Sequence, residues 1–372
     1  MRAIKTGFAF VLSACALAAA PPLRVAIIGL NHGHVGGFLN GGALAPAGGA
    51  LHRPDVQIVA VVEPDRALFD RVAPRLHLPA DWYFASIGEM AAKVHPDAAL
   101  VFTSTYGHTA AVEECAKRGI HVMMEKPMAV SYKDALAIER AAKAGHVHVL
   151  VDYETTWYAS NQAAYEMVES KAIGAVRKVL VRDGHNGPVA IHVQPEFFVW
   201  LTDPKLGGGG ALYDFGCYGA DLMTWLMHGE APLSVTAVTQ HFQPENYPKV
   251  DDEANVVLNY KSAVAILQGS WNWPFSIKDM DVFGSTGYVK TIRGNQVEAR
   301  RPGATEGQLS AAAALAAPYD DPLHYFAAVI RGEIQEGGRL SDLNTNVLVS
   351  EILDAARRSA ASGTTVRLPL RD

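Results

Sequence analysis

Short apolar segments that alternate with helix-forming segments restrict the fold of this chain more than any other feature. Five of them occur in the first 152 residues, at 23–30, 56–62, 97–102, 120–124 and 147–151. An apolar run of this length is typical of a strand buried on both faces of a parallel sheet. Amphipathic segments at 109–119 and 132–144 fit the connecting helices, and Ser131 is a suitable N-cap for the second. The alternation predicts a doubly wound parallel sheet.

A different pattern begins after Asp152. The segments expected to form strands there are separated by short turns and lie at 175–183, 233–240, 252–260, 263–271, 279–283 and 288–293. Strands joined in this way are antiparallel. Helices are expected at 153–170, 214–227, 323–331 and 343–359, and the helix at 214–227 is expected to cover one face of the sheet.

The length of 372 residues favours two domains over one core. We therefore predict an α/β chain with a Rossmann dinucleotide-binding domain at 21–152. The second domain, at 153–372, is predicted to be α+β with a large, open, mostly antiparallel sheet. Its carboxyl-terminal helices are expected to pack back on the first domain.

Residues 1–20 have the pattern of an export leader. Arg2 and Lys5 precede an apolar stretch at 7–20 that is too short to span a bilayer. Cleavage after Ala18 and lipidation of Cys15 are both open as processing routes. The sequence predicts a periplasmic or lipid-anchored protein without a transmembrane segment in the mature chain. If the start site is misassigned, the protein is expected in the cytoplasm.

The overall charge and the cysteines exclude several classes of partner. The formal net charge is −6 and the isoelectric point is about 6.2, which gives no reason to expect nucleic acid or an anionic membrane surface. The three cysteines, Cys15, Cys115 and Cys217, form no CxxC pair. We therefore expect neither a disulfide framework nor a metal site.

The turn after the first apolar segment, GLNHGH at 29–34, partly matches the dinucleotide fingerprint G-x-G-x-x-G. The fingerprint requires glycine at 29, 31 and 34, whereas this chain has Gly29, Asn31 and His34. A glycine-bearing turn that leads from a strand into a helix can still hold a pyrophosphate on backbone N–H groups. We expect this part of the cofactor site to comprise Gly29, Asn31, His32 and Gly33.

An acidic residue, Glu63, ends the second apolar segment. An acid at this place bonds the ribose hydroxyls of NAD and repels a 2′-phosphate. Glu63 lies 34 residues after Gly29, and a glycine- and alanine-rich loop at 41–50 accounts for the long spacing. NAD is therefore expected, although Arg66 nearby leaves NADP open.

Two further groups of residues indicate a reaction site. Glu125, Lys126 and Pro127 follow the fourth apolar segment, so Lys126 is expected at the carboxyl edge of the sheet, where open α/β sheets bind ligands. Asp214, Tyr218 and Asp221 follow four consecutive glycines. Their i, i+4, i+7 spacing places them on one face of a helix, which either faces water or lines a site.

These features together resemble the Gfo/Idh/MocA family of dinucleotide-dependent sugar and polyol oxidoreductases. Residues 125–127 match the E-K-P motif of that family, residues 208–221 are similar to its glycine-rich loop and helix, and residues 355–369 are similar to its carboxyl-terminal helix and tail. The resemblance implies that Lys126, Asp214 and Tyr218 converge over a nicotinamide ring. It also implies that the dinucleotide is contacted by Thr103, Thr105, His108, Glu125 and Lys126. Asn31 and His34 depart from the glycines usual in the family.

The expected activity is NAD(P)-dependent oxidation or reduction of a sugar, polyol or glycoside by hydride transfer. We expect Tyr218 to act as the acid/base, Lys126 to orient it and exchange a proton with it, and Asp214 to bind a sugar hydroxyl, with these roles exchangeable among the three residues. A cationic lysine is expected to lower the pKa of Tyr218, and burial is expected to lower the pKa of Lys126. Tyr153 and Asp221 are also expected to contact the carbohydrate substrate.

Two alternatives remain open. Nicotinamide is scarce outside the cytoplasm, so an exported oxidoreductase is expected to pair the oxidation of one sugar with the reduction of another, or else to retain its NAD as a redox-neutral glycosidase or lyase. Such a glycosidase or lyase oxidises its substrate, eliminates the leaving group, adds water and returns the hydride. The second alternative is a non-catalytic dinucleotide-binding protein. The open sheet is also expected to mediate a homo-oligomer.

Overall fold

The computed structural model describes residues 21–371, so the predicted leader lies outside the described residues. The first sheet has six parallel strands in the order β3-β2-β1-β4-β5-β6. They are β1 Leu23–Ile28, β2 Val56–Val62, β3 Tyr83–Phe84, β4 Ala98–Val101, β5 His121–Glu125 and β6 Val149–Asp152. This is the strand order of a Rossmann fold, with its switch point between β1 and β4. The predicted parallel sheet is confirmed.

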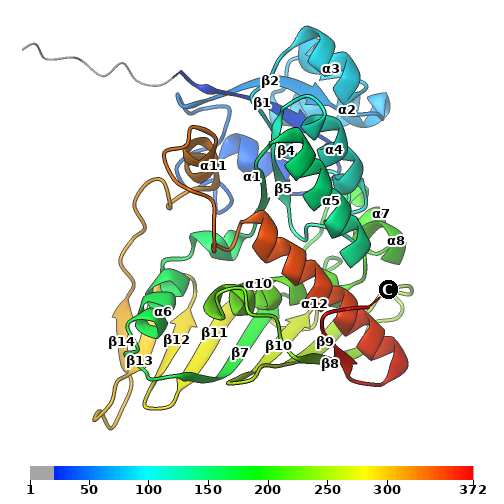
Figure 1. The fold of residues 1–372 in the computed structure, drawn as a ribbon. Coiled ribbons are helices and arrows are strands. Elements are labelled where there is room, and N and C mark those ends of the chain that lie inside the picture. The colour runs from blue at the N-terminus through cyan, green and yellow to red at the C-terminus, as the bar shows by residue number, and fades with distance from the viewer. Residues whose placement is uncertain (1–20, 372) are drawn as a thin grey trace, which may run out of the picture.

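Helices flank this sheet on both faces (Figure 1). They are α1 Val35–Asn40, α2 Arg66–Val72, α3 Ile87–Lys93, α4 Gly107–Ala116 and α5 Tyr132–Gly145, with 3-10 turns at Ala73–Leu76, Ala80–Trp82 and Glu154–Trp157. Ser131 accepts a hydrogen bond from the backbone N–H of Asp134 at 3.2 Å, which confirms it as the N-cap of α5. The two-residue strand β3 and the short helix α3 were not expected from the sequence.

The second sheet has nine strands in the order β14-β13-β12-β11-β7-β10-β9-β8-β15. They are β7 Val176–Gly184, β8 Ser234–Gln240, β9 Glu253–Asn259, β10 Val264–Ser270, β11 Ile277–Gly284, β12 Tyr288–Ile292, β13 Gln296–Arg300, β14 Gln308–Ala311 and β15 Val366–Arg367. Every neighbouring pair is antiparallel except β7 and β10. The predicted large, mostly antiparallel sheet is confirmed.

Three helices cover one face of the second sheet, namely α6 Ala159–Glu169, α10 Gly216–Leu226 and α12 Leu343–Ser362 (Figure 1). The side chains of each strand alternate accordingly. In β9, Val256 and Leu258 are buried under the helices, whereas Val257 on the other face is exposed. This period of two is what directs one face of the sheet to the core.

The expected single helix at 214–227 is wrong. The chain forms α9 Ala211–Asp214 and α10 Gly216–Leu226, with Phe215 between them. Gly269 of β10 packs directly against this break, because a Cβ at that position would lie 2.8 Å from the Gly216 nitrogen. Asp214 therefore does not share a helical face with Tyr218 and Asp221. Two short helices that precede the break, α7 Pro195–Leu201 and α8 Pro204–Gly207, were also not expected.

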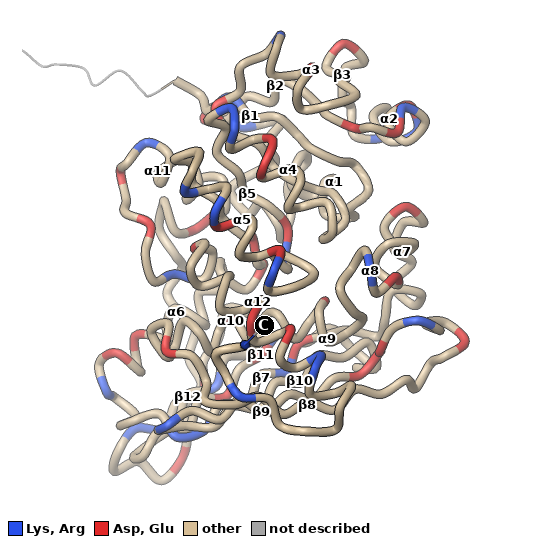
Figure 2. The backbone as a smooth tube through the Cα atoms, turned by 45° about the vertical axis from the view of Figure 1, so that its right-hand side comes forward, with Lys and Arg blue, Asp and Glu red and all other residues tan. Residues whose placement is uncertain are grey.

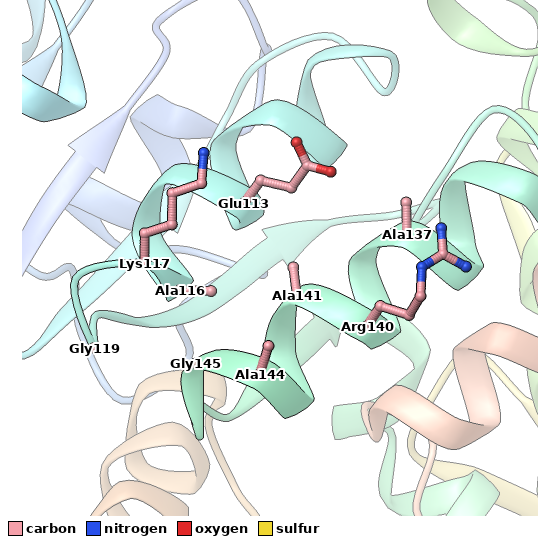
Figure 3. Close-up of a pocket in the computed structure, with 9 residues that line it drawn as sticks. All are labelled: Glu113, Ala116, Lys117, Gly119, Ala137, Arg140, Ala141, Ala144 and Gly145. Atoms are coloured by element: carbon pink, nitrogen blue, oxygen red, sulfur yellow. The ribbon is translucent and has the colours of Figure 1, made fainter.

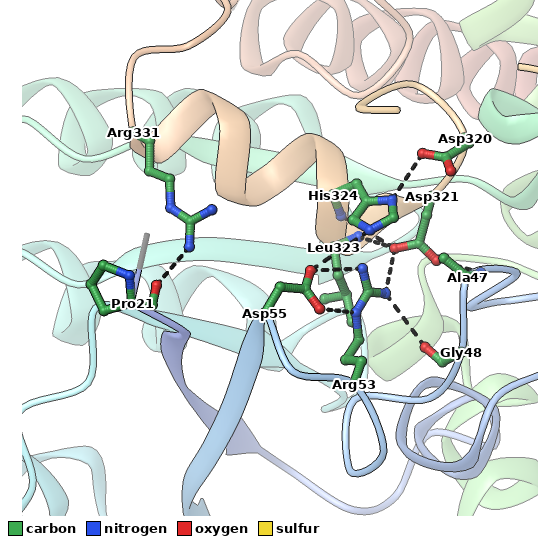
Figure 4. Close-up of polar contacts among 10 residues, drawn as sticks. All are labelled: Pro21, Ala47, Gly48, Arg53, Asp55, Asp320, Asp321, Leu323, His324 and Arg331. Atoms are coloured by element: carbon green, nitrogen blue, oxygen red, sulfur yellow. Dashed lines mark hydrogen bonds and ion pairs between the residues drawn. The ribbon is translucent and has the colours of Figure 1, made fainter. Parts of the chain in front are cut away.

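Helix α11, Pro322–Ile330, packs against the first sheet although it follows the second in the chain (Figure 1). Asp321 caps it by accepting hydrogen bonds from the backbone N–H groups of Leu323 and His324. The same buried carboxylate accepts from the Arg53 guanidinium at 2.7 Å and from the N–H of Ala47 at 3.1 Å (Figure 4). One carboxylate thus joins α11 to the loop before β2.

Basic and acidic residues are interspersed along both halves of the described chain (Figure 2). Within residues 21–371, no helix combines the length and the apolar character needed to cross a membrane.

Candidate active site

Lys126 and Asp214 form a buried ion pair between the two sheets. Lys126 follows β5, and its Nζ donates to Asp214 Oδ1 at 2.5 Å and to the Asp214 carbonyl at 3.0 Å. Trp271 Nε1 donates to the other carboxylate oxygen at 2.9 Å. Both oxygens of Asp214 are therefore occupied, and the Lys126 ammonium retains one N–H for another acceptor.

The pairing sets the charge of both residues. Burial alone lowers the pKa of Lys126, but the Asp214 carboxylate outweighs it and raises that pKa above its ordinary value. Burial likewise opposes ionisation of Asp214, yet Lys126 brings the pKa of Asp214 to about 2. The expected lowering of the Lys126 pKa is wrong, because a carboxylate rather than an apolar wall faces the ammonium.

Tyr218 lies beside this pair on α10. The Nζ atoms of Lys126 and Lys278 lie over its ring, at 5.1 and 5.2 Å from the ring centre. Burial and the neighbouring Glu154 raise the pKa of Tyr218 well above its ordinary value. The expected lowering of this pKa is wrong, since Asp214 neutralises Lys126 and the ammonium faces the ring. At neutral pH Tyr218 is a phenol that can donate a hydrogen bond but does not act as a base.

A cavity of about 280 Å³ opens onto these side chains. Its walls bring together all three predicted catalytic residues, Lys126, Asp214 and Tyr218. They also include His34, His185 and Lys278, which sequence reasoning did not assign to the reaction. Lys278 lies on β11 and pairs with Glu154. No sequence motif marks Lys278, because only the pairing of β11 with β7 brings it to the cavity.

Two predicted substrate contacts lie elsewhere, since neither Asp221 nor Tyr153 lines the cavity. Tyr153 is fully buried and donates from its hydroxyl to Asn346 Oδ1 at 2.9 Å. Its ring packs edge-on against Tyr218 at 5.4 Å, so it supports that residue from behind. Asp221 is also fully buried, and neither of its carboxyl oxygens has a hydrogen-bond partner among the described residues.

Asp221→Asn is expected to stabilise the protein increasingly as the pH rises. Burial, reinforced by Asp342, raises the pKa of Asp221 well above its ordinary value. The folded state therefore keeps a proton that the unfolded chain releases above about pH 4. The stability that this proton contributes is present at low pH and is lost as pH rises toward the folded-state pKa. Urea unfolding at pH 5 and pH 8 should show that the variant has the higher free energy of unfolding, with a difference from the parent of about 1–3 kcal/mol at pH 8. Parallel pH profiles would contradict a buried, neutral Asp221.

The glycine turn satisfies the main requirements of a dinucleotide cradle. Gly29 has φ +84°, and a Cβ there would lie 2.7 Å from Thr103 Cγ2, so glycine is required. Among the described residues, no hydrogen bond uses the backbone N–H of Asn31 or Gly33, which leaves both for an acceptor. Glu63 directly follows β2, as predicted, and its side chain is buried. Its carboxylate accepts a hydrogen bond from the backbone N–H of Leu30 at 2.9 Å. These residues fit a bound dinucleotide.

The other predicted cofactor residues surround this turn. Thr105 and His32 line a narrow cavity with Lys126, and the Thr103 hydroxyl donates to the Ser104 carbonyl at 3.0 Å. His108 is buried, with Nδ1 at 3.2 Å from the Met128 carbonyl and with Nε2 unpartnered among the described residues. Such an orphaned polar atom is consistent with a ligand site.

Helix α7 covers the same turn. Trp200 Nε1 donates to the Asn31 carbonyl at 3.0 Å, and the Phe197 ring lies 4.5 Å from the His32 ring. These aromatic residues contact the first sheet from a segment that follows β7. The sequence did not predict this contact, because nothing in the local pattern of residues 195–201 indicates that the segment packs against the glycine turn.

A larger cavity, of about 760 Å³, is a groove between α4 and α5 (Figure 3). Its lining consists mainly of small residues, with Glu113, Lys117 and Arg140 as its charged side chains. It contains none of the predicted site residues. Volume alone therefore does not identify the reaction site.

Two family matches cover most of the chain. Residues 23–153 match the oxidoreductase family with an NAD-binding Rossmann fold, and residues 161–290 match the GFO/IDH/MocA carboxyl-terminal domain. The chain is 28% identical to trans-1,2-dihydrobenzene-1,2-diol dehydrogenase of Xenopus laevis over 206 aligned residues. The alignment covers 55% of this chain and 58% of the relative. The chain thus spans less than two thirds of this curated relative.

Solved structures agree over nearly the whole chain. Aldose-aldose oxidoreductase from Caulobacter crescentus, complexed with glycerol, has a TM-score of 0.75 at 22% identity and covers 93% of this chain and 100% of its own. An inositol dehydrogenase homologue from Azotobacter vinelandii, complexed with NAD⁺, has a TM-score of 0.77 at 20% identity. The match covers 94% of this chain and 98% of the homologue. At this identity they show the fold. From the two family matches and this architecture, the chain belongs to the Gfo/Idh/MocA family, whose amino-terminal domain is an NAD-binding Rossmann fold.

Proposed function

We propose that the protein is an NAD(P)-dependent oxidoreductase that acts on a CH–OH group of a sugar, polyol or glycoside. The observation that carries this proposal is the Lys126–Asp214 ion pair beside Tyr218 in a cavity at the carboxyl edge of the parallel sheet. The relatives named above carry names that refer to a diol, an aldose and an inositol. Vicinal hydroxyl groups are the chemistry that these names share.

Bound NAD supplies the hydride acceptor in this reaction. The remaining N–H of Lys126 is available to the oxygen of the reacting hydroxyl, and its positive charge stabilises that oxygen as it loses its proton. Asp214 holds the ammonium in place, and Trp271 holds Asp214. Tyr218 donates a hydrogen bond from the cavity wall. The apolar side chains of Phe197, Leu201 and Phe215 line the same cavity and limit water.

A redox-neutral glycosidase or lyase that retains NAD is the second candidate. The cover that Trp200 and Phe197 form over the glycine turn supports it, because such a cover slows the escape of a bound dinucleotide. A retained cofactor is what an enzyme without a supply of fresh NAD requires.

Mass spectrometry and turnover assays separate the candidates. Denatured, purified protein is expected to release a stoichiometric dinucleotide, whose mass distinguishes NAD from NADP. With a panel of sugars and glycosides, an oxidoreductase accumulates reduced nicotinamide. A redox-neutral enzyme releases sugar without accumulating it. A bound dinucleotide with no turnover on the panel would contradict both and support a binding protein.

Two further proposals concern location and assembly. Export to the periplasm, with or without a lipid on Cys15, stays a prediction from residues 1–20. A homo-oligomer through the uncovered face of the second sheet is supported by Val238 and Val257, which are 59% and 37% exposed there. Light scattering of the purified protein measures the assembly directly.

A further inference from the structure

His34 and Glu125 form a pair at the edge of the reaction cavity. His34 Nδ1 lies 2.9 Å from Glu125 Oε1. Glu125 ends β5 and is 2% exposed, whereas the side chain of His34 is 31% exposed and lines the cavity. A histidine at the third fingerprint position therefore connects the glycine turn to the residue that precedes Lys126.

The pair determines which ring nitrogen carries the proton. Burial raises the pKa of Glu125, but His34, His32 and Lys126 outweigh it and hold the pKa below its ordinary value. Glu125 is therefore an ionised carboxylate, which only accepts hydrogen bonds. Nδ1 of His34 must then donate, and Nε2 of the neutral ring keeps a lone pair. Among the described residues, no hydrogen bond reaches this Nε2.

A metal site built from the same residues does not fit these hydrogen bonds. The donor atoms of His32, His34 and Glu125 lie within 4.8 Å of one another. However, His32 Nδ1 accepts the backbone N–H of His34 at 3.2 Å, so the neutral ring carries its proton on Nε2. That nitrogen points toward Glu125 at 3.9 Å as an N–H group rather than as a lone pair. Two potential ligands remain, fewer than the protein supplies in a zinc site.

The reaction proposed above needs a proton acceptor that the three predicted catalytic residues do not supply. At neutral pH Lys126 is protonated, Tyr218 is a phenol, and Asp214 is a weak base with both oxygens occupied. With its Nδ1 paired to Glu125, His34 has Nε2 as its second ring nitrogen, and the residue lines the same cavity. A base oriented by a carboxylate is a recurrent arrangement in enzymes.

We propose that His34, held by Glu125, is the general base of this site. The inference rests on the proposed oxidoreductase function. As the substrate is oxidised, its O–H bond breaks and the proton forms a bond to His34 Nε2. The electron pair of that O–H bond forms the carbonyl, and nicotinamide, where bound, would accept the hydride released from the carbon. Glu125 stabilises the resulting imidazolium, and the partly exposed edge of the His34 ring returns the proton to solvent. For reduction the steps run in reverse.

Charged and titratable side chains from three parts of the chain surround His34. Glu125 from β5, His32 from the same turn and Glu154 from the segment after β6 interact with it electrostatically, and the Phe197 ring from α7 lies 6.5 Å away. Two carboxylates thus face a possible imidazolium.

The test compares His34→Gln with His148→Gln in the holoprotein. His148 also pairs with a carboxylate, its Nδ1 lying 2.9 Å from Glu336 Oε2, but it does not line the reaction cavity. His34→Gln is expected to lower kcat by about 10²–10⁴-fold and to remove the acidic limb of the pH–rate profile, with unchanged dinucleotide content. Added imidazole is expected to restore part of the activity of His34→Ala. His148→Gln should keep the parental rate and pH profile. Equal behaviour of the two variants would overturn the proposal.

A second measurement does not depend on turnover. In ¹⁵N-histidine-labelled protein at pH 7.5, the His34 ring, assigned by its loss in His34→Gln, is expected to carry its proton on Nδ1. Glu125→Gln is expected to shift these ring signals. A ring protonated on Nε2 would overturn the proposal while leaving the oxidoreductase function intact. Stoichiometric metal that disappears in His34→Gln would also overturn it. If the parent binds dinucleotide but oxidises no sugar, the proposed function fails and the catalytic role of His34 fails with it.

Discussion

Lys126→Met is expected to reduce turnover by at least about 10³-fold while the protein still releases dinucleotide on denaturation. Among residues 21–371, the variant removes the only cation that bonds to Asp214, together with the N–H that remains for the substrate oxygen. It is also expected to be less stable by about 3–5 kcal/mol, because removing one partner leaves a buried carboxylate without its counter-charge. Steady-state kinetics, mass spectrometry and urea unfolding measure the three effects.

The double variant Lys126→Met/Asp214→Asn separates chemistry from folding. The asparagine side chain carries no charge, so most of the lost stability is expected to return while the activity stays lost. Its amide oxygen can still accept a hydrogen bond from Trp271 Nε1. Activity that returned together with stability would show that Lys126 acts only through the fold. Lys290→Ala, at a partly exposed pair with Glu298, serves as the control for mutation of a lysine.

Arg53→Met is expected to lower the free energy of unfolding by about 3 kcal/mol. The Arg53 side chain is 4% exposed and its guanidinium bonds to both Asp55 and Asp321, of which Asp321 is completely buried (Figure 4). Methionine fills a similar volume but leaves the Asp321 carboxylate with backbone donors alone. Urea unfolding measures the loss, and hydrogen exchange is expected to increase first in α11 and in the loop at 45–55.

The matched control is Arg66→Ala. Arg66 pairs with Asp70 one helical turn away, and both side chains are more than half exposed. Exposed pairs of this kind contribute about 0.3–0.5 kcal/mol. A similar loss in the two variants would show that burial of the Arg53 network adds nothing to its strength.

Most of the fold could be predicted because its signals are local. An apolar run of five to eight residues between helix signals indicates a buried parallel strand whatever it packs against, and β1, β2, β4, β5 and β6 all lie where expected. The same reasoning placed Lys126 at the carboxyl edge of the first sheet. The elements that were missed, such as α7, α8, β13 and β14, are short and have weak periodicity.

The site could be predicted only in part. Lys126, Asp214 and Tyr218 do meet at one cavity, but the helical spacing used to group Asp214 with Asp221 was broken at Phe215. Spacing along a chain describes a face only while the helix continues. Asp221 turned inward because the second sheet and α12 cover α10 from both sides. Tyr153, which follows β6, turned inward to bond Asn346 of α12.

By itself the sequence determined the order of strands and helices, the Rossmann class and the position of the Glu125-Lys126-Pro127 segment, because periodicity and turn residues act over a few neighbours. Only the tertiary structure decided the protonation states of the site. Asp214 raises the pKa of Lys126, and burial with Glu154 raises the pKa of Tyr218, and both shifts are opposite to expectation. The pairing of His34 with Glu125 spans 91 positions in the chain. Charges that distant in sequence interact only after folding has removed the water between them.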